Sequence, residues 1–295
     1  MFLIHNVFQA KTMKTTNTLK AITKTLRVAI CGVGTVGGGV AQILAQNAEL
    51  LTARCGGRSL DLIAVADQRP LNELEEELKG HLNVTHYSDA MKMIEEEDLD
   101  VIVETIGGYT VALNVCGTAL EKGVSICTAN KALLALHGKK LASIAESNNA
   151  HIGWEAAVGG GIPCIRVLKQ GLAANNITYA AGILNGTCNF ILTTMKEEGR
   201  DFDDVLAEAQ EKGYAETPPD LDVDGIDTAH KISLVRVSTK KRFDPSDLMT
   251  VLTNFIFFFF FLFSFCKRSL LLLLVVCHLS ILYTSKVSVI YLVKM

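Results

Sequence analysis

The chain has 295 residues, 49% of them hydrophobic, and its 28 basic and 31 acidic residues give a formal net charge of −3. This length leaves room for two domains, and the charge excludes the basic footprint of a nucleic-acid-binding protein. Eight cysteines without a C-x-x-C pair are typical of small core residues in a reducing compartment, so we expect a cytoplasmic protein.

The first 25 residues contain no acidic residue, four lysines and many threonines. Arginine is absent before Arg27, and the apolar h-region of a secretory signal is missing. We therefore predict a disordered leader over residues 1–25, with an organellar presequence as the alternative.

A glycine-rich segment, Cys-Gly-Val-Gly-Thr-Val-Gly at 31–37, follows the short apolar run Leu26–Ile30. This order of strand, loop and helix is typical of a dinucleotide-binding turn, in which the glycines permit a tight turn, approach of a pyrophosphate and close helix packing. The predicted cofactor contacts are Gly32, Gly34, Thr35, Val36 and Gly37. We expect the next helix to bury one apolar stripe on a sheet, formed by Val36, Val40, Ile43, Leu44, Ala48 and Leu51.

Asp67 ends the second predicted strand, Leu60–Ala66, where an acid can bond the ribose hydroxyls of a dinucleotide. An insertion at 54–58 explains why it lies further from the glycine loop than the usual ~20 residues. Arg69 is a candidate partner of a 2′-phosphate, the alternative being a solvated turn residue. The choice between NAD and NADP therefore stays open.

The middle of the chain repeats the alternation of strand and helix. We predict strands at Val101–Thr105 and Val124–Thr128, with a helix at Val111–Lys122 between them. Lys131 comes three residues after the later strand. Because open α/β sheets bind ligands outside the carboxyl ends of their strands, Lys131 is a candidate site residue, although a solvent-exposed helix-start lysine is the alternative.

The next predicted strand, His151–Ala157, runs into Val-Gly-Gly-Gly-Ile-Pro at 158–163. Carbonyls exposed in such a turn, together with the Glu155 carboxylate, suit a hard cation. The residues by themselves favour packing instead, because glycines let a helix that begins near Pro163 approach the sheet.

A second domain is expected from about Ile162. It contains a predicted strand at Ile177–Leu184, a helix from Asn185 to Lys196, and an amphipathic helix that begins near Phe202 and ends at Gly213.

The stretch 213–231 carries five acids and a lysine. Asp227 and Lys231 are four residues apart, so a helix would place both side chains on one face. With Glu216 upstream, they suit a small polar substrate whose amino group binds a carboxylate while the lysine moves a proton. A solvated acidic loop followed by a surface salt bridge is the alternative.

Several motifs in this order resemble the homoserine dehydrogenase family over about residues 26–234. They are Gly-Val-Gly-Thr-Val-Gly at 32–37, Thr-Ala-Asn-Lys at 128–131, Glu-Ala-Ala-Val-Gly-Gly-Gly-Ile-Pro at 155–163, Asn-Gly-Thr-Cys-Asn at 185–189 and the acidic stretch 213–231. The resemblance implies an α/β fold: a Rossmann-type, doubly wound parallel sheet over 26–161 that binds NAD(P), then an incomplete α+β substrate and dimerisation domain over 162–234.

The resemblance also implies roles for individual residues. Lys231 would be the proton donor and acceptor, and Lys131 would contact cofactor and substrate. L-homoserine would be bound by Glu216, Asp222 and Asp227. The nicotinamide nucleotide would lie against Thr105 and Gly213. A sodium ion would be held by Glu155 with the carbonyls of Val158, Gly160 and Ile162, which reverses the preference for packing at that turn.

The implied activity is that of an NAD(P)-dependent oxidoreductase acting on a CH–OH group. It interconverts L-aspartate 4-semialdehyde and L-homoserine in the biosynthesis of threonine, methionine and isoleucine. The implied ligands are NADP or NAD, a sodium ion and the amino-acid substrate. Family members pair through the second domain, so a homodimer is implied, whereas nucleic acid and membrane partners are not expected.

Residues 235–295 depart from the resemblance. Phe255–Phe265 is nearly pure phenylalanine and Leu270–Val276 is purely aliphatic, without periodicity, caps or turn signals. Because codons for phenylalanine, leucine and serine are rich in pyrimidines, we hypothesise that this tail translates an unspliced intron or a frame error. The alternatives to an active enzyme are an inactive, truncated nucleotide-binding remnant and a membrane-tethered variant, although each apolar run is shorter than the ~20 residues of a spanning helix.

Overall fold

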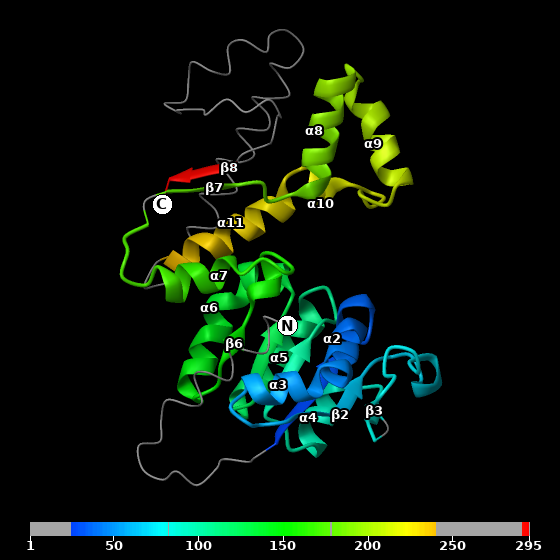
Figure 1. The fold of residues 1–295 in the computed structure, drawn as a ribbon, viewed down its shortest axis with the longest axis vertical. Coiled ribbons are helices and arrows are strands. Elements are labelled where there is room, and N and C mark those ends of the chain that lie inside the picture. The colour runs from blue at the N-terminus through cyan, green and yellow to red at the C-terminus, as the bar shows by residue number, and fades with distance from the viewer. Residues whose placement is uncertain (1–24, 82, 178, 240–290, 295) are drawn as a thin grey trace. The chain divides into compact units, whose positions relative to one another are not determined.

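The computed structural model (Figure 1) describes residues 25–81, 83–177, 179–239 and 291–294. The predicted leader, apart from residue 25, and the apolar runs of the predicted tail lie outside the described residues. The chain divides into two compact units, Met1–Ala173 and Ala174–Met295.

The first unit is built on a six-stranded sheet in the order β3-β2-β1-β4-β5-β6, in which all neighbouring strands are parallel. The strands are β1 Leu26–Cys31, β2 Leu60–Ala66, β3 Thr85–Tyr87, β4 Val101–Glu104, β5 Ser125–Thr128 and β6 Ile152–Gly153. All residues of β4 and β5 are buried, as expected for strands covered on both faces. The strand order reverses between β1 and β4, which is the switch point where sheets of this type bind dinucleotides.

Helices connect these strands and form two groups. They are α2 Thr35–Gln46, α3 Ala48–Arg54, α4 Ala90–Glu96, α5 Thr110–Glu121, α6 Lys131–Ser147 and the short α7 Cys164–Arg166, with single turns at Leu71–Glu73, Glu155–Ala157 and Val167–Gly171. Helix α2 contacts α3, whereas α5 contacts both α4 and α6. The doubly wound α/β fold expected from the sequence is confirmed.

Two details of this unit differ from the sequence-based expectation. Val36 is 53% exposed, and the buried residues of α2 are Gly37, Gly38, Ala41 and Leu44. The buried face is thus centred on the glycines, because residues without side chains allow the helix to approach its neighbours closely. The strand expected at His151–Ala157 is limited to β6, since the chain turns at Glu155.

The second unit contains a helical hairpin, two further helices and a small sheet (Figure 1). The helices are α8 Gly186–Glu198, α9 Phe202–Glu211, α10 Asp220–Val223 and α11 Ile226–Thr239, and strand β7 Tyr179–Gly182 pairs antiparallel with β8 Tyr291–Lys294. Gly199 ends α8 with a φ of +70°, and α8 and α9 then pack through Ile191, Val205 and Ala209.

Helix α11 continues through Leu234, where the resemblance was expected to end, as far as Thr239, after which the chain is not described until residue 291. The domain limits expected at residues 161 and 234 stay predictions. Within the described part of the chain, no helix is both long enough and apolar enough to cross a membrane.

Candidate active site

The glycine loop between β1 and α2 packs tightly against the protein at Gly32 and Gly37, whereas no protein atom lies close to it at Gly34. Gly32 has a φ of +87°, and a Cβ there would lie 2.6 Å from the carbonyl oxygen of Thr105. A Cβ at Gly37 would lie 2.0 Å from the carbonyl oxygen of Gly32. A Cβ at Gly34, in contrast, would meet no atom within 4 Å. Gly34 precedes α2 without a capping side chain, so the N–H groups of the first turn can receive a pyrophosphate.

Thr105 supports this loop from the end of β4. Its hydroxyl donates to the carbonyl oxygen of Gly32 at 2.7 Å. Thr35 and Val36 are exposed in the first turn of α2. The predicted cofactor residues of the loop and Thr105 therefore lie together at the carboxyl ends of neighbouring strands.

Asp67 and Arg69 form a compact ionic cluster with the same loop. Asp67 accepts from the backbone N–H of Val33 at 2.7 Å and from the backbone N–H of Arg69 at 3.0 Å. The Arg69 guanidinium donates to Asp67, to the Val33 carbonyl oxygen at 2.8 Å and to Glu77 at 3.4 Å. Burial acts to raise the pKa of Asp67, but its bonds from Arg69 and Val33 and the Arg69 charge outweigh burial and lower that pKa below its ordinary value.

A hydrogen-bond network connects the ends of β4 and β5 to Asn130, the residue before α6. Glu104 and Thr128 are both 0% exposed, and the Thr128 hydroxyl donates to the Glu104 carboxylate. The other Glu104 oxygen accepts from the backbone N–H of Ile106 at 3.0 Å. Thr128 also accepts from the backbone N–H of Asn130, whose side chain caps α6. This places Lys131 as the first residue of α6, at the carboxyl edge of the sheet.

Glu155 acts as a cap on the turn that follows Pro163. Its side chain is buried, and its two oxygens accept from the backbone N–H groups of Ile165 at 2.8 Å and Arg166 at 2.9 Å. The carbonyl oxygen of Ile162 accepts from the backbone N–H of Cys164 at 2.9 Å. A Cβ at Gly160 or Gly161 would meet no atom within 4 Å, so these two glycines do not mark a close approach of the helix to the sheet.

In the second unit, Asp227 and Lys231 meet on one face of α11, as the four-residue spacing predicts. Lys231 Nζ lies 2.8 Å from Asp227 Oδ2 and donates to the Leu184 carbonyl oxygen at 2.8 Å. Asn185 Nδ2 also donates to Asp227 Oδ2, at 3.0 Å, and to Asp222 Oδ1 at 2.8 Å. The structure thus joins two of the three predicted substrate carboxylates to the predicted catalytic lysine.

The remaining predicted residues of this unit lie on its surface. Glu216 is exposed in the loop between α9 and α10. Gly213 follows α9 with a φ of +71° and is also exposed. Neither residue is joined to the Asp227–Lys231 pair by the bonds described above, so their roles stay predictions.

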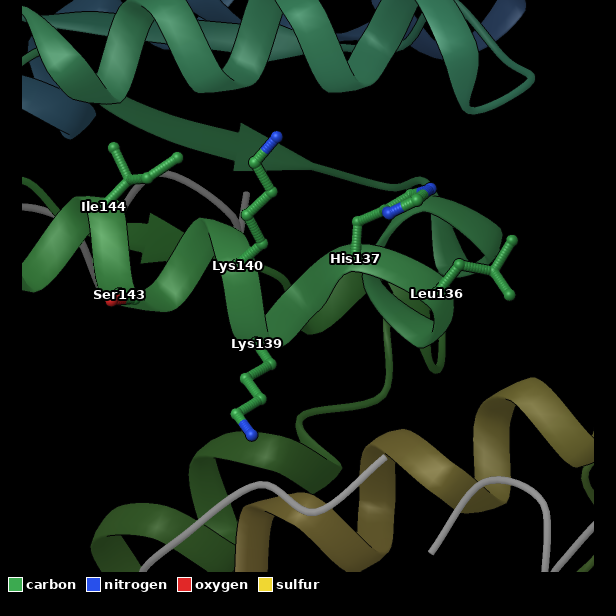
Figure 2. Close-up of a pocket in the computed structure, with 6 residues that line it drawn as sticks. All are labelled: Leu136, His137, Lys139, Lys140, Ser143 and Ile144. Atoms are coloured by element: carbon green, nitrogen blue, oxygen red, sulfur yellow. The ribbon is translucent and has the colours of Figure 1, made fainter. Parts of the chain in front are cut away.

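A surface pocket of about 450 Å³ lies along α6. Figure 2 shows that its lining comes from this one helix, with Lys139 and Lys140 pointing in opposite directions. The lining residues are Leu136, His137, Lys139, Lys140, Ser143 and Ile144. None of the predicted site residues is among them, so the pocket adds nothing to the site.

Sequence reasoning did not single out Glu104 and Asn185, two buried polar residues that connect the neighbours of the predicted site residues. Glu104 is an acid at the end of an otherwise apolar, buried strand, which is a signal that could have identified it. Asn185 opens the motif Asn-Gly-Thr-Cys-Asn and was expected only as the start of a helix. Its bonds reach residues 37 and 42 positions away, and no local pattern encodes those contacts.

Comparison with known proteins gives a consistent result for both units. A family model described as "Homoserine dehydrogenase, NAD binding domain" matches residues 32–155, and a second, described as "Homoserine dehydrogenase", matches residues 163–253. The second match extends past Leu234, so the expectation that the resemblance ends there is wrong for residues 235–253. A homoserine dehydrogenase from Pseudomonas aeruginosa is 46% identical over 212 residues, which cover 72% of this chain and 48% of that protein.

Solved structures show the same likeness. The crystal structure of a homoserine dehydrogenase from Thiobacillus denitrificans matches with a TM-score of 0.69 and 39% identity, over 75% of this chain and 51% of that one. A hyperthermophilic archaeal homoserine dehydrogenase in complex with NADPH matches with a TM-score of 0.64 and 30% identity, over 74% of this chain and 70% of that one. The chain spans about half the length of the curated relatives it matches. On these matches, and on the glycine loop and the Asp227–Lys231 pair, the chain belongs to the homoserine dehydrogenase family.

Proposed function

We propose that this chain carries the active site of an NAD(P)-dependent oxidoreductase that interconverts L-homoserine and L-aspartate 4-semialdehyde. The observation that carries the proposal is the geometry of Lys231. Its ammonium group has three N–H donors, and Asp227 Oδ2 and the Leu184 carbonyl oxygen accept two of them. Among the described residues this leaves one N–H for a substrate oxygen, and the two bonds fix the direction in which it points.

The residues of this chain divide the chemistry between them. A bound nicotinamide dinucleotide supplies or accepts the hydride, and the loop of Gly32, Gly34 and Gly37 binds its pyrophosphate. Lys231 donates a proton to the aldehyde oxygen in reduction and takes it back in oxidation. The Asp222 and Asp227 carboxylates attract the substrate ammonium group, which orients the reacting carbon. Lys131, at the carboxyl edge of the sheet, supplies a second positive charge near the nucleotide.

The ionic cluster at the end of β2 favours NAD over NADP. Asp67 and Glu77 place two carboxylates around the single guanidinium of Arg69. A 2′-phosphate would have to draw the Arg69 guanidinium away from both acids and would lie beside the negatively charged Asp67, whereas the neutral ribose hydroxyls of NAD meet neither cost. This preference differs from that suggested by the NADPH complex of the archaeal relative.

The sodium ion, the homodimer and the cytoplasmic location stay predictions. Both Glu155 carboxylate oxygens and the Ile162 carbonyl oxygen accept a backbone N–H group, and each keeps a second lone pair that a cation would use. No step of the proposed reaction depends on sodium.

The direct test is Lys231→Ala in the full chain. We expect kcat for NADH or NADPH oxidation with L-aspartate 4-semialdehyde to fall by about 10²-fold or more, the usual contribution of a positioned general acid. Nucleotide affinity should change by less than about two-fold, because the substitution leaves the glycine loop and Asp67, the proposed contacts of the nucleotide, in place. Lys196→Ala, which removes an exposed lysine of α8, is the matched control and should retain activity. Near-normal turnover by Lys231→Ala would remove Lys231 from this role.

A second candidate function is nucleotide binding without turnover, which the open glycine loop of the first unit would support by itself. Nucleotide titration followed by fluorescence, run beside the activity assay, separates the two: binding without turnover by the unaltered chain would establish the non-catalytic remnant.

A further inference from the structure

Asn185 lies at the centre of the acidic site and is 3% exposed. One amide nitrogen donates to two carboxylates, Asp222 at 2.8 Å and Asp227 at 3.0 Å. The same Asp227 oxygen contacts Lys231 Nζ. Asn185 therefore contacts both of the predicted substrate carboxylates. One of them, Asp227, also contacts the predicted catalytic lysine.

The orientation of this amide is set by a separate contact. Asn185 precedes α8, and its Oδ1 accepts from the backbone N–H of Cys188 at 2.7 Å. Because an N-cap must present an oxygen to the helix, the NH₂ group has to face the carboxylates. The capping bond thus serves as an orienting device for the two bonds to Asp222 and Asp227.

The charges around the amide explain why a neutral donor is needed. Two carboxylates that share one neighbour repel each other unless a donor or cation lies between them. Lys231 neutralises Asp227 from one side, and Asn185 bridges Asp227 to Asp222 without adding charge. The Cys188 thiol also faces the cluster, but burial first, and then Asp222 and Asp227, raise its pKa to about 11, so it is neutral at physiological pH. Asp220 in α10 and Asp224, which follows this helix, are both exposed.

We propose that Asn185 is a positioning residue, which holds Asp222 and Asp227 in one cluster against Lys231 by donating its amide N–H groups to both acids. In the reaction, Asn185 thus fixes the positions of both carboxylates that bind the substrate. One of these, Asp227, also orients Lys231. The expected effect of Asn185 on turnover rests on the proposed function. Its expected effect on stability rests on the hydrogen bonds alone.

The informative variant is Asn185→Asp in the full chain. Aspartate is as good an N-cap as asparagine, so the start of α8 is retained. The variant replaces the bridging amide by an oxygen, and two carboxylates close to the new acid raise its pKa. Below that pKa the protonated acid can still donate to one neighbour. Above it, three carboxylates repel one another.

We expect kcat/KM for L-homoserine to fall between about 10- and 100-fold at about pH 8, the size of one lost hydrogen bond to a charged group. The deficit relative to the unaltered chain should shrink as the pH is lowered towards about 5. A deficit that is the same at every pH would overturn the proposal, because a merely structural defect has no reason to follow the ionisation of residue 185.

Thermal unfolding gives a second readout that needs no activity. The difference in Tm between the unaltered chain and Asn185→Asp should be small at about pH 5 and clearly larger at about pH 8. Asn185→Ala loses both the cap and the bridge and should lower Tm equally at both pH values. Asn47→Asp adds a charge at the partly exposed junction of α2 and α3 and should show no such dependence.

The two arms separate the possible failures. If the unaltered chain does not turn over L-homoserine, the proposed function fails, and the unfolding arm still decides the role of Asn185. If the unaltered chain is active and Asn185→Asp shows no pH-dependent loss in either arm, the bridging role is wrong and the proposed function stands.

Discussion

At the scale of single residues, a few charged side chains surround the position proposed for the ribose of the nucleotide. Arg69 is held by Asp67, by the Val33 carbonyl oxygen and by Glu77. Sequence patterns identified Asp67 and Arg69 as candidates but could not choose between NAD and NADP, because Glu77 becomes their neighbour only through the fold. The depressed pKa of Asp67 keeps its carboxylate charged at physiological pH, which maintains this cluster.

Removal of one acid from the cluster should shift the preference. In Glu77→Gln, the Arg69 guanidinium keeps Asp67 but loses a competing negative charge, so it becomes more available to a 2′-phosphate. We expect the ratio of kcat/KM for NADPH to that for NADH to rise by up to about five-fold, in line with a partly exposed ion pair. Steady-state kinetics with both nucleotides measure this ratio.

The neighbouring acid supplies the control. Glu76 is 82% exposed and pairs only one turn away, with Lys79, on the surface. Glu76→Gln removes the same charge from the same segment without touching Arg69, so its ratio should stay unchanged. Equal shifts in both variants would mean that net charge, and not the cluster, sets the preference.

At the scale of elements, the contact between the glycine loop and α2 is the most demanding part of the fold. Gly37→Ala would place a Cβ 2.0 Å from the Gly32 carbonyl oxygen and 2.7 Å from the Thr105 hydroxyl oxygen. Both neighbours are held by backbone bonds, so the helix has to move. We expect a loss of about 1–3 kcal/mol in the free energy of unfolding, together with weaker nucleotide binding. Denaturant unfolding and nucleotide titration measure the two effects.

Gly39→Ala tests whether the clash, and not helix composition, is responsible. Gly39 lies two residues along the same helix, and a Cβ there would meet no atom within 4 Å. Because alanine is a better helix former than glycine, this variant should be more stable by up to about 1 kcal/mol. Destabilisation of both variants to the same extent would contradict the packing argument.

At the scale of the whole molecule, the exposed segment 171–176 joins the two compact units. We predict that, within the described residues, limited proteolysis of the intact chain with thermolysin first cuts at Leu172. This residue is 38% exposed and lies in a turn, so little structure has to open before cleavage. Mass spectrometry of the fragments locates the cut.

Leu192 provides an internal comparison in the same digest. It is 36% exposed, nearly the same fraction as Leu172, but lies inside α8. Cleavage there requires the helix to unfold and should appear later. Simultaneous cutting at both leucines would show that the segment 171–176 unfolds locally no more easily than helix α8.

The sequence by itself determined the features that depend on near neighbours in the chain. Strand β2 begins and ends where its apolar run does, the glycine loop lies between β1 and α2, and Asp227 and Lys231 meet at a spacing of four residues. Such features follow from backbone geometry and periodicity, which act over a few residues.

The tertiary structure decided what depends on residues far apart in the chain. It exposed Val36 by centring the buried face of α2 on glycines, made Glu155 a helix cap, and brought Asn185 to two acids 37 and 42 residues away. These outcomes depend on packing and on the requirement that buried polar groups find partners, and only the folded chain determines which partners are within reach.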